Sequence, residues 1–562
     1  MLAIRLAIQR RRFSAVSDYV VVGAGSAGCV MANRLTEDGS SSVTLLEAGG
    51  DDRGRLASLF VQMPSALAIP MSFTDLNWNF RLDPDQSLNG RIVSCPRGRL
   101  LGGSSSINGM VYVRGNRADF DSWKAMGAEG WAYADVLPYF KKAESWHGAA
   151  DPYRGQDGPL HVKHGDNPSG TPLHQAFIDA GVQAGYGAVH DYNGRHQEGF
   201  TKFAMTVFHS GPDRGKRCST SASYLKQARG RENLNVEVYA MAQRIVFDGT
   251  RAVAVEYRDR AGQLKRVQAR REVIVCAGAI LSPHLLQVSG IGDPNHLAAI
   301  NVPLVSASSG VGRNLQDHHE LYFQQECLEP VSLAQYVRNP IAKAAIGARW
   351  LLFKNGLGAT NHFESGAFIR SSPDVAYPNV QFHFLPVAVS YDGSSVAPSR
   401  TGHSFQIHVG TLRSRERGSI RALSSDVRDP PRIQFNALST DADWRELRDA
   451  LRAARLVVSQ PAMKGLAGSE ISPGPKCQSD DDLDRYIRQH LESAYHPCGT
   501  CRLGDVVDME GRVRGVDGVR VADASLMPQV TAGNLNAPVI MIAEKIADAI
   551  RGRKLPAAPG DL

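Results

Sequence analysis

Residues 18–47 have the hydrophobic pattern of a strand, a turn, a helix and a second strand. Tyr19 to Val22 is a short apolar run of the kind that forms a buried strand, and residues 29–35 are compatible with a helix. A second apolar run, Val43 to Leu46, has the length of a strand and ends at Glu47. We therefore predict a strand–helix–strand unit near the start of the chain.

The turn between the first strand and the helix is rich in glycine and reads Gly23-Ala-Gly25-Ser-Ala-Gly28. Gly23 permits a tight turn, Gly25 lets the backbone approach a pyrophosphate, and Gly28 lets helix and strand pack closely. The helix N-terminus offers N–H groups and a partial positive charge to phosphates. Glu47, 19 residues after Gly28, is placed to accept hydrogen bonds from a ribose. The unit predicts a dinucleotide site, and its position at the start of a long chain favours FAD over NAD.

Composition and charge narrow the class of protein. The chain has 562 residues, of which 43% are hydrophobic and 21% charged, which indicates a globular protein with more than one domain. The net charge is +7, but Arg5, Arg10, Arg11 and Arg12 precede the first acidic residue, Asp18. The remaining charge of about +3 is too small to indicate nucleic acid binding. No apolar run has the roughly 18 residues of a transmembrane helix, and peripheral membrane association stays open.

Residues 1–17 are rich in arginine, lack acids and place leucine and isoleucine at helical spacing. This pattern is typical of a mitochondrial transit peptide, and it predicts a location at the inner membrane or on the matrix side. The alternative is a basic bacterial N-terminus, with the protein in the cytoplasm or at the cytoplasmic membrane. Eight cysteines are few for this length, which fits a reducing compartment. Cys498-Gly-Thr-Cys501 has no second pair nearby, so we interpret it as two buried thiols and predict no metal site.

Five ordered blocks carry a resemblance to a known family. The first is Arg97-Gly-Arg-Leu-Leu-Gly-Gly-Ser-Ser-Ser-Ile-Asn-Gly-Met110, and the second runs from Gly278 to Gly292. Near the C-terminus stand Tyr495-His-Pro497, Asp523-Ala-Ser525 and Gly533-Asn-Leu-Asn-Ala-Pro538. On these blocks the chain resembles the glucose–methanol–choline (GMC) oxidoreductases. Within this family it is most similar to members that oxidise choline, including the stretch Asn314-Leu-Gln-Asp-His-His-Glu320.

The resemblance implies an α/β fold with two domains. We expect a Rossmann-like FAD-binding domain that is discontinuous in sequence and comprises residues 18–313 and 475–555. Residues 314–474 alternate strand-like runs, such as Phe405 to Val409, with helical ones, such as Ala442 to Ser459. This segment is expected to form the substrate domain, an antiparallel sheet capped by helices.

The resemblance also assigns the cofactor and its contacts. Small residues and hydroxyls in residues 102–109 let this loop lie flat against a planar cofactor. Ile107 stands where a histidine bonds covalently to the flavin in some relatives, so we expect tight, non-covalent FAD. The expected cofactor-binding residues are Gly23, Gly25, Gly28, Glu47, Gly102, Gly103, Ser104, Asn108, Asp523 and Asn536.

Alcohol oxidation by a flavin requires a base for the hydroxyl proton while a hydride moves from carbon to flavin N5. An imidazole suits this role because its pKa lies near neutrality. The resemblance places the base at His496 and its companion at Asn536, which we expect to orient the alkoxide through its amide.

The expected substrate is a small alcohol, and the resemblance favours choline. A trimethylammonium group cannot donate hydrogen bonds, so its recognition requires aromatic faces and a negative charge. Glu320 matches the acid of the choline-oxidising relatives, and Tyr495 and Phe363 fall at aromatic positions. His318 and His383 correspond to pocket histidines, although Phe363 and His383 are also compatible with core packing.

Several alternatives stay open at this point. A GMC enzyme acting on an aliphatic, aryl or sugar alcohol is one, and an FAD-containing hydroxynitrile lyase is another. A flavin-binding protein without catalysis is disfavoured by the His496 and Asn536 pair. We expect a quinone or another respiratory-chain component as the electron acceptor. Oxidation of betaine aldehyde onward to glycine betaine is chemically possible at the same site, and the residues do not decide it.

Overall fold

The computed structural model describes residues 16–54, 56–391, 393, 395–560 and 562. The predicted leader, residues 1–17, lies almost entirely outside these residues. Its last two residues, Val16 and Ser17, are the first residues of strand β1, where the Ser17 hydroxyl is 2.8 Å from that of Thr44. The predicted leader therefore overlaps the first two residues of β1, and its extent stays a prediction.

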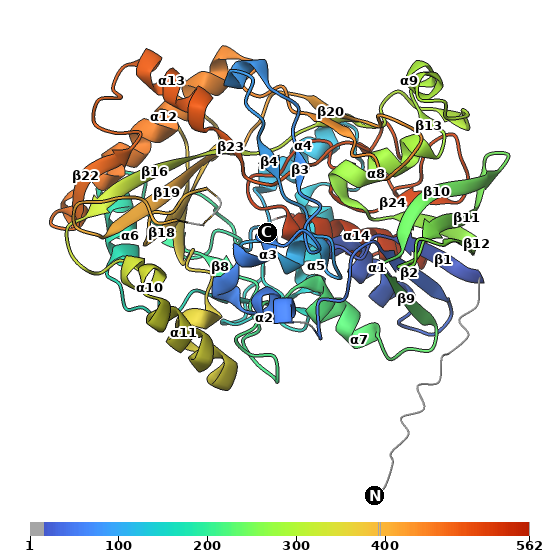
Figure 1. Ribbon diagram of the computed structural model, residues 1–562, viewed down its shortest axis with the longest axis horizontal. Coiled ribbons are helices and arrows are strands. Elements are labelled where there is room, and N and C mark those ends of the chain that lie inside the picture. Colours follow the sequence, from blue (N-terminus) through green and yellow to red (C-terminus); the bar gives the residue numbers. More distant parts are fainter. Residues whose placement is uncertain (1–15, 55, 392, 394, 561) are drawn as a thin grey trace, which may run out of the picture.

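The first sheet has parallel strands at its centre, in the order β10-β11-β12-β1-β2-β9 (Figure 1). The strands are β1 (Val16–Val22), β2 (Val43–Glu47), β9 (Leu234–Val238), β10 (Met241–Asp248), β11 (Arg251–Arg258), β12 (Leu264–Val275) and β24 (Val519–Val521). β1 pairs in parallel with β12 on one side and β2 on the other. β24 pairs with the last residues of β12 and brings the C-terminal part of the chain into the same sheet. The predicted discontinuous Rossmann-like unit is confirmed.

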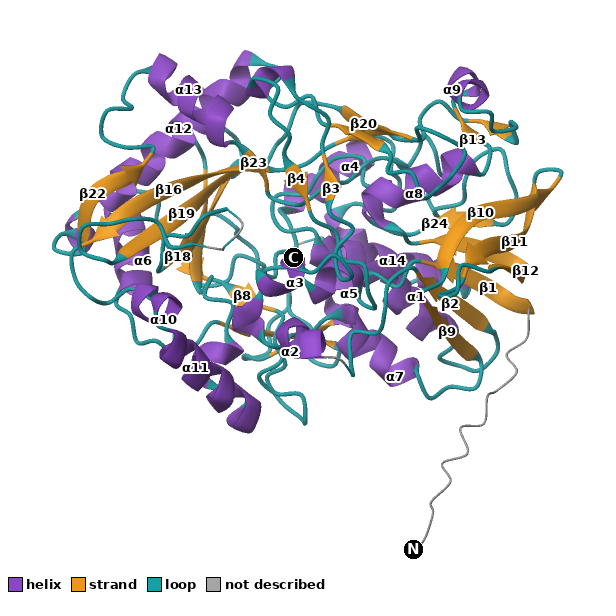
Figure 2. Ribbon diagram, in the orientation of Figure 1, coloured by secondary structure: helices purple, strands orange, loops and turns teal. Residues whose placement is uncertain are grey.

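The second sheet is antiparallel, in the order β22-β16-β19-β18-β17-β7, with β23 also paired to β16 (Figure 2). The strands are β7 (Gly199–Lys202), β16 (His319–Cys327), β17 (Ser365–Ile369), β18 (Val380–Leu385), β19 (Ser404–Thr411), β22 (Ala467–Ser472) and β23 (Glu492–Ser493). Its apolar side chains share one core with helices α6 and α12. The expected antiparallel sheet with helical cover is confirmed. β7 and β23 extend it from outside residues 314–474, and the exact domain boundaries stay a prediction.

The remaining elements connect and cover these sheets. The helices are α1 (Ser26–Leu35), α2 (Leu56–Gln62), α3 (Ile69–Ser72), α4 (Arg117–Ala125), α5 (Tyr133–Ala143), α6 (Leu173–Gln183), α7 (Lys226–Ala228), α8 (Gly278–Val288), α9 (Pro294–Ala299), α10 (Ala334–Arg338), α11 (Pro340–Phe353), α12 (Asp441–Val458), α13 (Asp480–His490) and α14 (Asn536–Ile550). Shorter strands form small sheets from β3 (Phe80–Arg81), β4 (Ser94–Cys95), β5 (Glu144–Trp146), β6 (Leu160–His164), β8 (Ala204–Met205), β13 (Ile291–Gly292), β14 (Ser306–Ala307), β15 (Arg313–Leu315), β20 (Gly418–Arg421) and β21 (Arg432–Gln434). No helix in the described parts of the chain is long and apolar enough to cross a membrane.

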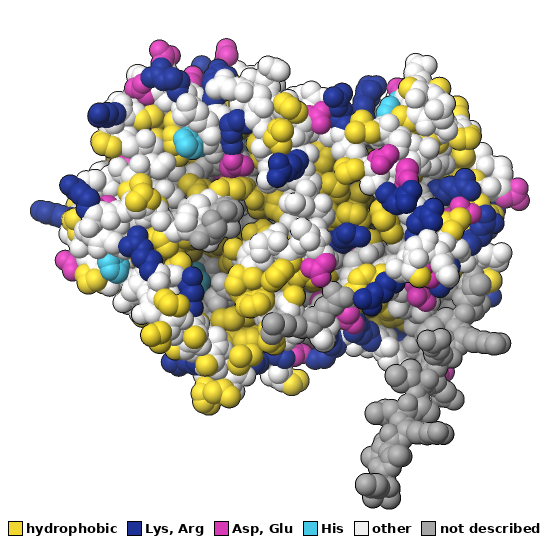
Figure 3. All heavy atoms as spheres, in the orientation of Figure 1, with side chains coloured by type: hydrophobic (Ala, Val, Ile, Leu, Met, Phe, Trp, Pro, Cys, Tyr) yellow, Lys and Arg dark blue, Asp and Glu magenta, His cyan; other side chains and the backbone are white. Residues whose placement is uncertain are grey.

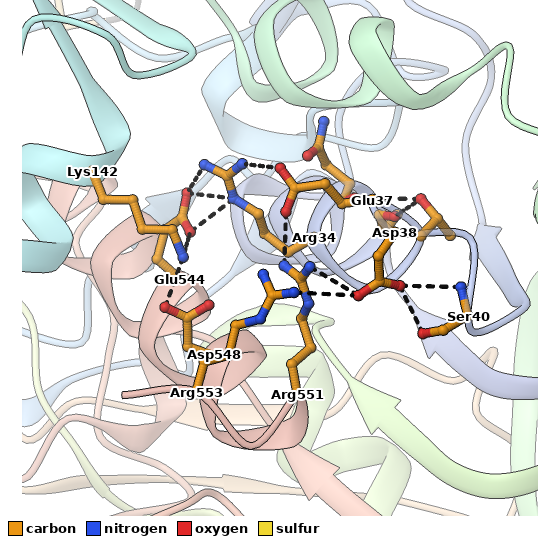
Figure 4. Close-up of polar contacts among 12 residues, drawn as sticks. Arg34, Glu37, Asp38, Ser40, Lys142, Glu544, Asp548, Arg551 and Arg553 are labelled. Carbon is orange, nitrogen blue, oxygen red and sulfur yellow. Dashed lines mark hydrogen bonds and ion pairs between the residues drawn. The ribbon is translucent and has the colours of Figure 1, made fainter. Parts of the chain in front are cut away.

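A buried ion pair joins α1 to α14, although the two helices come from opposite ends of the chain (Figure 4). Arg34 on α1 donates to both carboxylate oxygens of Glu544 on α14, at 2.7 to 3.0 Å. The Tyr224 hydroxyl donates to Glu544 at 2.8 Å, and the Lys142 ammonium lies 3.1 Å from the same carboxylate. Glu544 is fully buried, so the pair is stable only because these donors replace the water that it has lost.

We predict that Glu544→Gln lowers the free energy of unfolding by about 3 kcal/mol, because it leaves Arg34 buried without its main counter-charge. Denaturant unfolding followed by tryptophan fluorescence measures the change. Arg553→Gln is the matched control, since it removes only an exposed partner of Asp38 on the same surface and is expected to change stability by less than about 0.5 kcal/mol. Equal losses in the two variants would contradict a special role for the buried pair.

Candidate active site

A cavity of about 930 Å³ lies where the first sheet, the second sheet and the residue 97–110 loop meet. Figure 3 shows a hollow with hydrophobic walls on the face in view. The glycine turn after β1 lines one part of the cavity, and side chains of β16, β18 and β19 line another. The predicted cofactor and substrate residues are thus brought together mostly around one space.

The glycine turn leaves room for a phosphate-bearing ligand. A Cβ atom on Gly28 would lie 1.8 Å from the Gly23 carbonyl oxygen, so Gly28 serves the packing of α1 on β1 and is not part of the cavity wall. A Cβ on Gly25 would meet only the Gly103 Cα, at 4.0 Å. Gly25 therefore faces open space at the N-terminus of α1, as a close approach of pyrophosphate requires.

Glu47 lies at the end of β2, where it also helps to shape the turn. Its carboxylate accepts hydrogen bonds from the backbone N–H groups of Ala24, at 2.9 Å, and Gly49, at 2.8 Å. Burial raises the pKa of Glu47 to about 7. Glu47 lines the cavity, so a hydroxyl pair such as that of a ribose can reach it.

The loop of the first family block packs against the glycine turn. Gly102 has a φ of +87°, and a Cβ on Gly103 would lie 2.7 Å from the Gly25 Cα, so both positions require glycine. Ser104 and Asn108 line the cavity, and Arg217 holds Asn108 through its carbonyl and amide oxygens. Ile107 lines the cavity as well, and its hydrocarbon side chain has no atom that can bond covalently to a flavin.

Two further helix N-termini face the same space. Asp523 accepts hydrogen bonds from the Gly278 N–H group, at 2.8 Å, and from the Ser282 hydroxyl, and so caps α8. Asn536, the first residue of α14, accepts a hydrogen bond from the Ser26 hydroxyl of α1 at 2.7 Å. Three helix N-termini, an acid at a strand end and a glycine-walled cleft fit the size and charge of FAD.

His496 contacts two side chains, Asn534 and His318. Its Nε2 lies 3.1 Å from the amide nitrogen of Asn534, and its Nδ1 lies 3.0 Å from Nδ1 of His318. Asn536 accepts its hydrogen bond from Ser26 and lines the same cavity, so its predicted role in orienting the alkoxide stays a prediction beside the observed contact of Asn534. Both asparagines belong to the Asn-Leu-Asn block, in which Asn534 precedes α14 and Asn536 is its first residue.

The protonation state of His496 follows from these contacts. Burial, and then the neighbouring imidazoles of His318 and His383, hold the pKa of His496 well below its usual value. With the Asn534 amide nitrogen directed at Nε2, we assign the proton of the neutral ring to Nδ1, from which it is donated to His318. Nε2 is therefore an acceptor on the cavity side.

A buried carboxylate holds the His496 segment in place. Asp317 accepts hydrogen bonds from the backbone N–H groups of His496, at 2.7 Å, and His318, at 2.8 Å, and from the Ser493 hydroxyl. Burial raises the pKa of Asp317 to about 6. Tyr495 has a left-handed φ of 65°, and Arg97 donates to its carbonyl oxygen at 2.7 Å. Asp317 and Arg97 thus fix the backbone on both sides of the imidazole.

A carboxylate surrounded by aromatic rings forms the other end of the cavity. Glu320 lies 3.5 Å from Nδ1 of His408, and the His408 ring lies 4.0 Å from that of Tyr322. The Tyr391 ring is 5.3 Å from Tyr322 and 5.7 Å from Tyr495. Burial, and then the charge of Glu320, hold the pKa of Tyr322 well above its usual value, so this phenol is neutral.

The remaining predicted substrate residues separate into two groups. Phe363 and His383 both line the cavity, and the Phe363 ring lies 5.2 Å from that of His408. His383 approaches the Asn534 amide oxygen at 3.4 Å, and burial lowers its pKa to about 4. His318 lies behind His496 and is not part of the cavity wall.

Sequence reasoning missed Asp317, Tyr322, Tyr391, His408 and Asn534. Tyr322 carried a usable signal, because it stands two positions after Glu320 on β16 and alternate residues of a strand share a face. Tyr391 and His408 come from segments far from Glu320 in the sequence, and no local pattern marks them.

Comparisons with known proteins place the chain in a family. Models of the GMC oxidoreductase family match residues 17–320 and 414–543. The chain is 50% identical over 546 residues to the oxygen-dependent choline dehydrogenases of Escherichia coli strains E24377A and K12, with 96% of each chain covered.

Solved structures agree on the fold. A pyridoxine 4-oxidase from Mesorbium loti matches with a TM-score of 0.83 and 29% identity, covering 96% of this chain and 100% of that one. A formate oxidase matches with a TM-score of 0.88 at 23% identity, covering 96% and 98% of the two chains, and this likeness concerns the fold alone. The chain belongs to the GMC oxidoreductases and is an FAD-dependent oxidoreductase that acts on CH–OH groups.

Proposed function

We propose that this enzyme oxidises choline to betaine aldehyde. The observation that carries the proposal is the Glu320 carboxylate, which lies among aromatic rings in the cavity that also contains His496. A trimethylammonium group is recognised by aromatic faces and a nearby negative charge. The 50% identity to proteins named choline dehydrogenase supports the same substrate.

In the proposed reaction, His496 takes the hydroxyl proton of choline at Nε2, which faces the cavity as an acceptor. The Asn534 amide N–H, which donates to Nε2 in the absence of substrate, turns to the developing alkoxide and stabilises its charge. Nδ1 keeps its proton and its contact with His318, so the imidazole stays oriented when it becomes charged. FAD, when bound, supplies the acceptor for the hydride that leaves the alcohol carbon.

Glu320 positions the substrate in this scheme. Its charge attracts the quaternary nitrogen, while the Tyr322, Tyr391 and Phe363 rings offer apolar faces to the methyl groups. The alcohol end then extends toward His496 within the same cavity. Whether the hydrated aldehyde returns for a second oxidation to glycine betaine depends on its residence in this cavity.

We predict that His496→Ala and Asn534→Ala both bind FAD but reduce it more slowly. The loss of the base is expected to slow reduction on the order of a hundredfold, and the loss of the amide at least about tenfold. Anaerobic stopped-flow mixing of loaded enzyme with choline measures the rate. Asn536→Ala is the matched control, expected to weaken FAD binding through the lost Ser26 contact while the loaded fraction reacts at a nearly normal rate. Slower reduction in Asn536→Ala than in Asn534→Ala would give the catalytic role to Asn536, as the sequence predicts.

We predict that Glu320→Gln raises KM for choline by about 10- to 100-fold, because a desolvated charge contact is worth about 1.5–3 kcal/mol. The neutral isostere 3,3-dimethylbutan-1-ol serves as the control substrate. Its KM should stay unchanged or fall in the variant, since it never gained from the charge. If KM for the two alcohols rose equally, the carboxylate would not be the cation site.

The alternatives make different predictions for the same protein. A family member specific for an aliphatic, aryl or sugar alcohol would reduce its flavin faster with that alcohol than with choline. A hydroxynitrile lyase would not bleach its flavin with any alcohol under anaerobic conditions. The aromatic rings and the acid around the substrate position favour choline over these alternatives.

We further propose that electrons leave through a quinone or another respiratory-chain component, at a membrane surface. We predict that quinone reduction by the purified enzyme with choline exceeds hydrogen peroxide formation several-fold, and paired assays of the two products measure this. Peroxide as the main product would identify an oxidase. The relatives named above are bacterial, which favours the bacterial location, while the mitochondrial leader stays a prediction on residues 1–17.

A further inference from the structure

Helix α11 is apolar and yet almost entirely exposed. Ten of its 14 residues are Ala, Ile, Leu, Trp or Phe, and within this fully described helix only Trp350 is buried. The exposed fractions are 79% for Ile341, 74% for Leu352, 67% for Phe353 and 49% for Leu351. Large apolar side chains gathered in this way on a surface mark a site of interaction. Figure 3 shows them at the lower left of the molecule, where Figure 1 places α11.

Hydrogen bonds at the start of α11 and near its end fix the helix to the rest of the protein. Its exposed face therefore belongs to a folded element and not to a frayed helix end. Asn339 caps its start by accepting hydrogen bonds from the backbone N–H groups of Ile341 and Ala342. The Trp350 indole N–H donates to the Gly215 carbonyl oxygen at 2.8 Å. Lys343, Ala344, Ile346 and Gly347 line the active-site cavity, so one side of α11 forms part of its wall, while Ile341, Leu352 and Phe353 are exposed.

The charge around α11 has a single sign in the sequence. No acidic residue stands between Glu329 and Glu364, whereas Arg338, Lys343, Arg349 and Lys354 all lie in this interval. The segment that receives Trp350 contains Asp213, but Lys216 and Lys226 are both paired with that carboxylate. The charged residues next to the apolar face in sequence are therefore all cations, and one of them, Lys343, also lines the cavity.

We propose that α11 lies on a bilayer that contains anionic phospholipid, with Ile341, Leu351, Leu352 and Phe353 inserted at the level of the acyl chains. An apolar helical face bordered by Lys and Arg is the pattern of an interfacial helix, which gains both from buried apolar area and from attraction to anionic headgroups. Because α11 also lines the cavity, this docking places the cavity wall beside the membrane. The inference deepens the proposed function, because a lipid-soluble acceptor would then reach the enzyme from the bilayer.

The same charges argue against a second copy of the chain as the occupant. A two-fold interface with its axis beside α11 would bring the helix against its own image, so Arg338, Arg349 and Lys354 of the two copies would approach one another without acids from this segment to pair them. The phosphates of an anionic lipid surface carry the charge opposite to these cations, and the surface extends beyond all edges of the apolar face. The bilayer therefore satisfies both the apolar and the charged residues of the surface.

Vesicle flotation with the purified, FAD-loaded full chain tests the proposal. The enzyme should float with phosphatidylglycerol–phosphatidylcholine vesicles, and less with phosphatidylcholine alone or at high salt, since exposed charges are screened. Leu352→Ser combined with Phe353→Ser should weaken binding by about tenfold or more. The matched control is Leu264→Ser with Leu423→Ser, which removes two other exposed apolar side chains, on β12 and just beyond β20, away from α11 (Figure 1). The control should float like the unaltered enzyme.

Absence of flotation with anionic vesicles would overturn the proposal, as would equal binding by both double variants. A dimer that the Leu352→Ser, Phe353→Ser variant converts to a monomer, without vesicle binding, would assign the surface to a second copy and would also overturn it. Choline oxidation with a soluble dye as acceptor tests the proposed function separately from membrane docking. None of the four substituted residues lines the cavity, so both double variants should keep full dye-linked activity. Failure of the dye assay in the unaltered enzyme would reject the substrate and leave membrane docking intact.

Discussion

The buried contact between Arg34 and Glu544 is the constraint on which the site depends. The two residues stand 510 positions apart, yet their side chains meet at hydrogen-bond distance inside the protein. α1 begins at the glycine turn and α14 begins immediately after the Asn534 turn, so joining the helices aligns the cofactor end of the cavity with its catalytic end. Separating the two helices would leave a buried ion without its main partner, which disfavours other packings of this pair.

Asp317 plays a corresponding part between the two sheets. It precedes β16 and binds the backbone of the segment that carries His496, so the substrate strand and the base cannot move independently. The hydrogen bonds come from backbone N–H groups and so fix the main chain from which the imidazole extends. Glu320 and Tyr322 lie on β16, shortly after Asp317. Because Asp317 binds the His496 backbone, β16 sets the distance between the cation site and the base.

The electrostatics of the cavity suit a cationic alcohol. Burial keeps the imidazoles of His318, with a pKa lowered to about 3, and of His383 uncharged near neutrality. The phenol of Tyr322 is also neutral, for the same reason. A cation that enters therefore meets aromatic faces and the neutral imidazole of His383, and His496 carries no positive charge before the reaction.

The sequence by itself determined the elements whose signals are local. The run Tyr19 to Val22, the glycine turn and the run ending at Glu47 specify strand, turn and strand through the chemistry of consecutive residues, and the family blocks extended this to FAD and to His496. What only the tertiary structure decided was which distant side chains meet. Asn534 and Asn536 are nearly identical in local context, and the orientation of the turn before α14, held by contacts with α1, gives one to His496 and the other to Ser26. Tyr391 and His408 reach Glu320 through sheet register and loop packing, which depend on pairings across dozens of residues that no short pattern encodes.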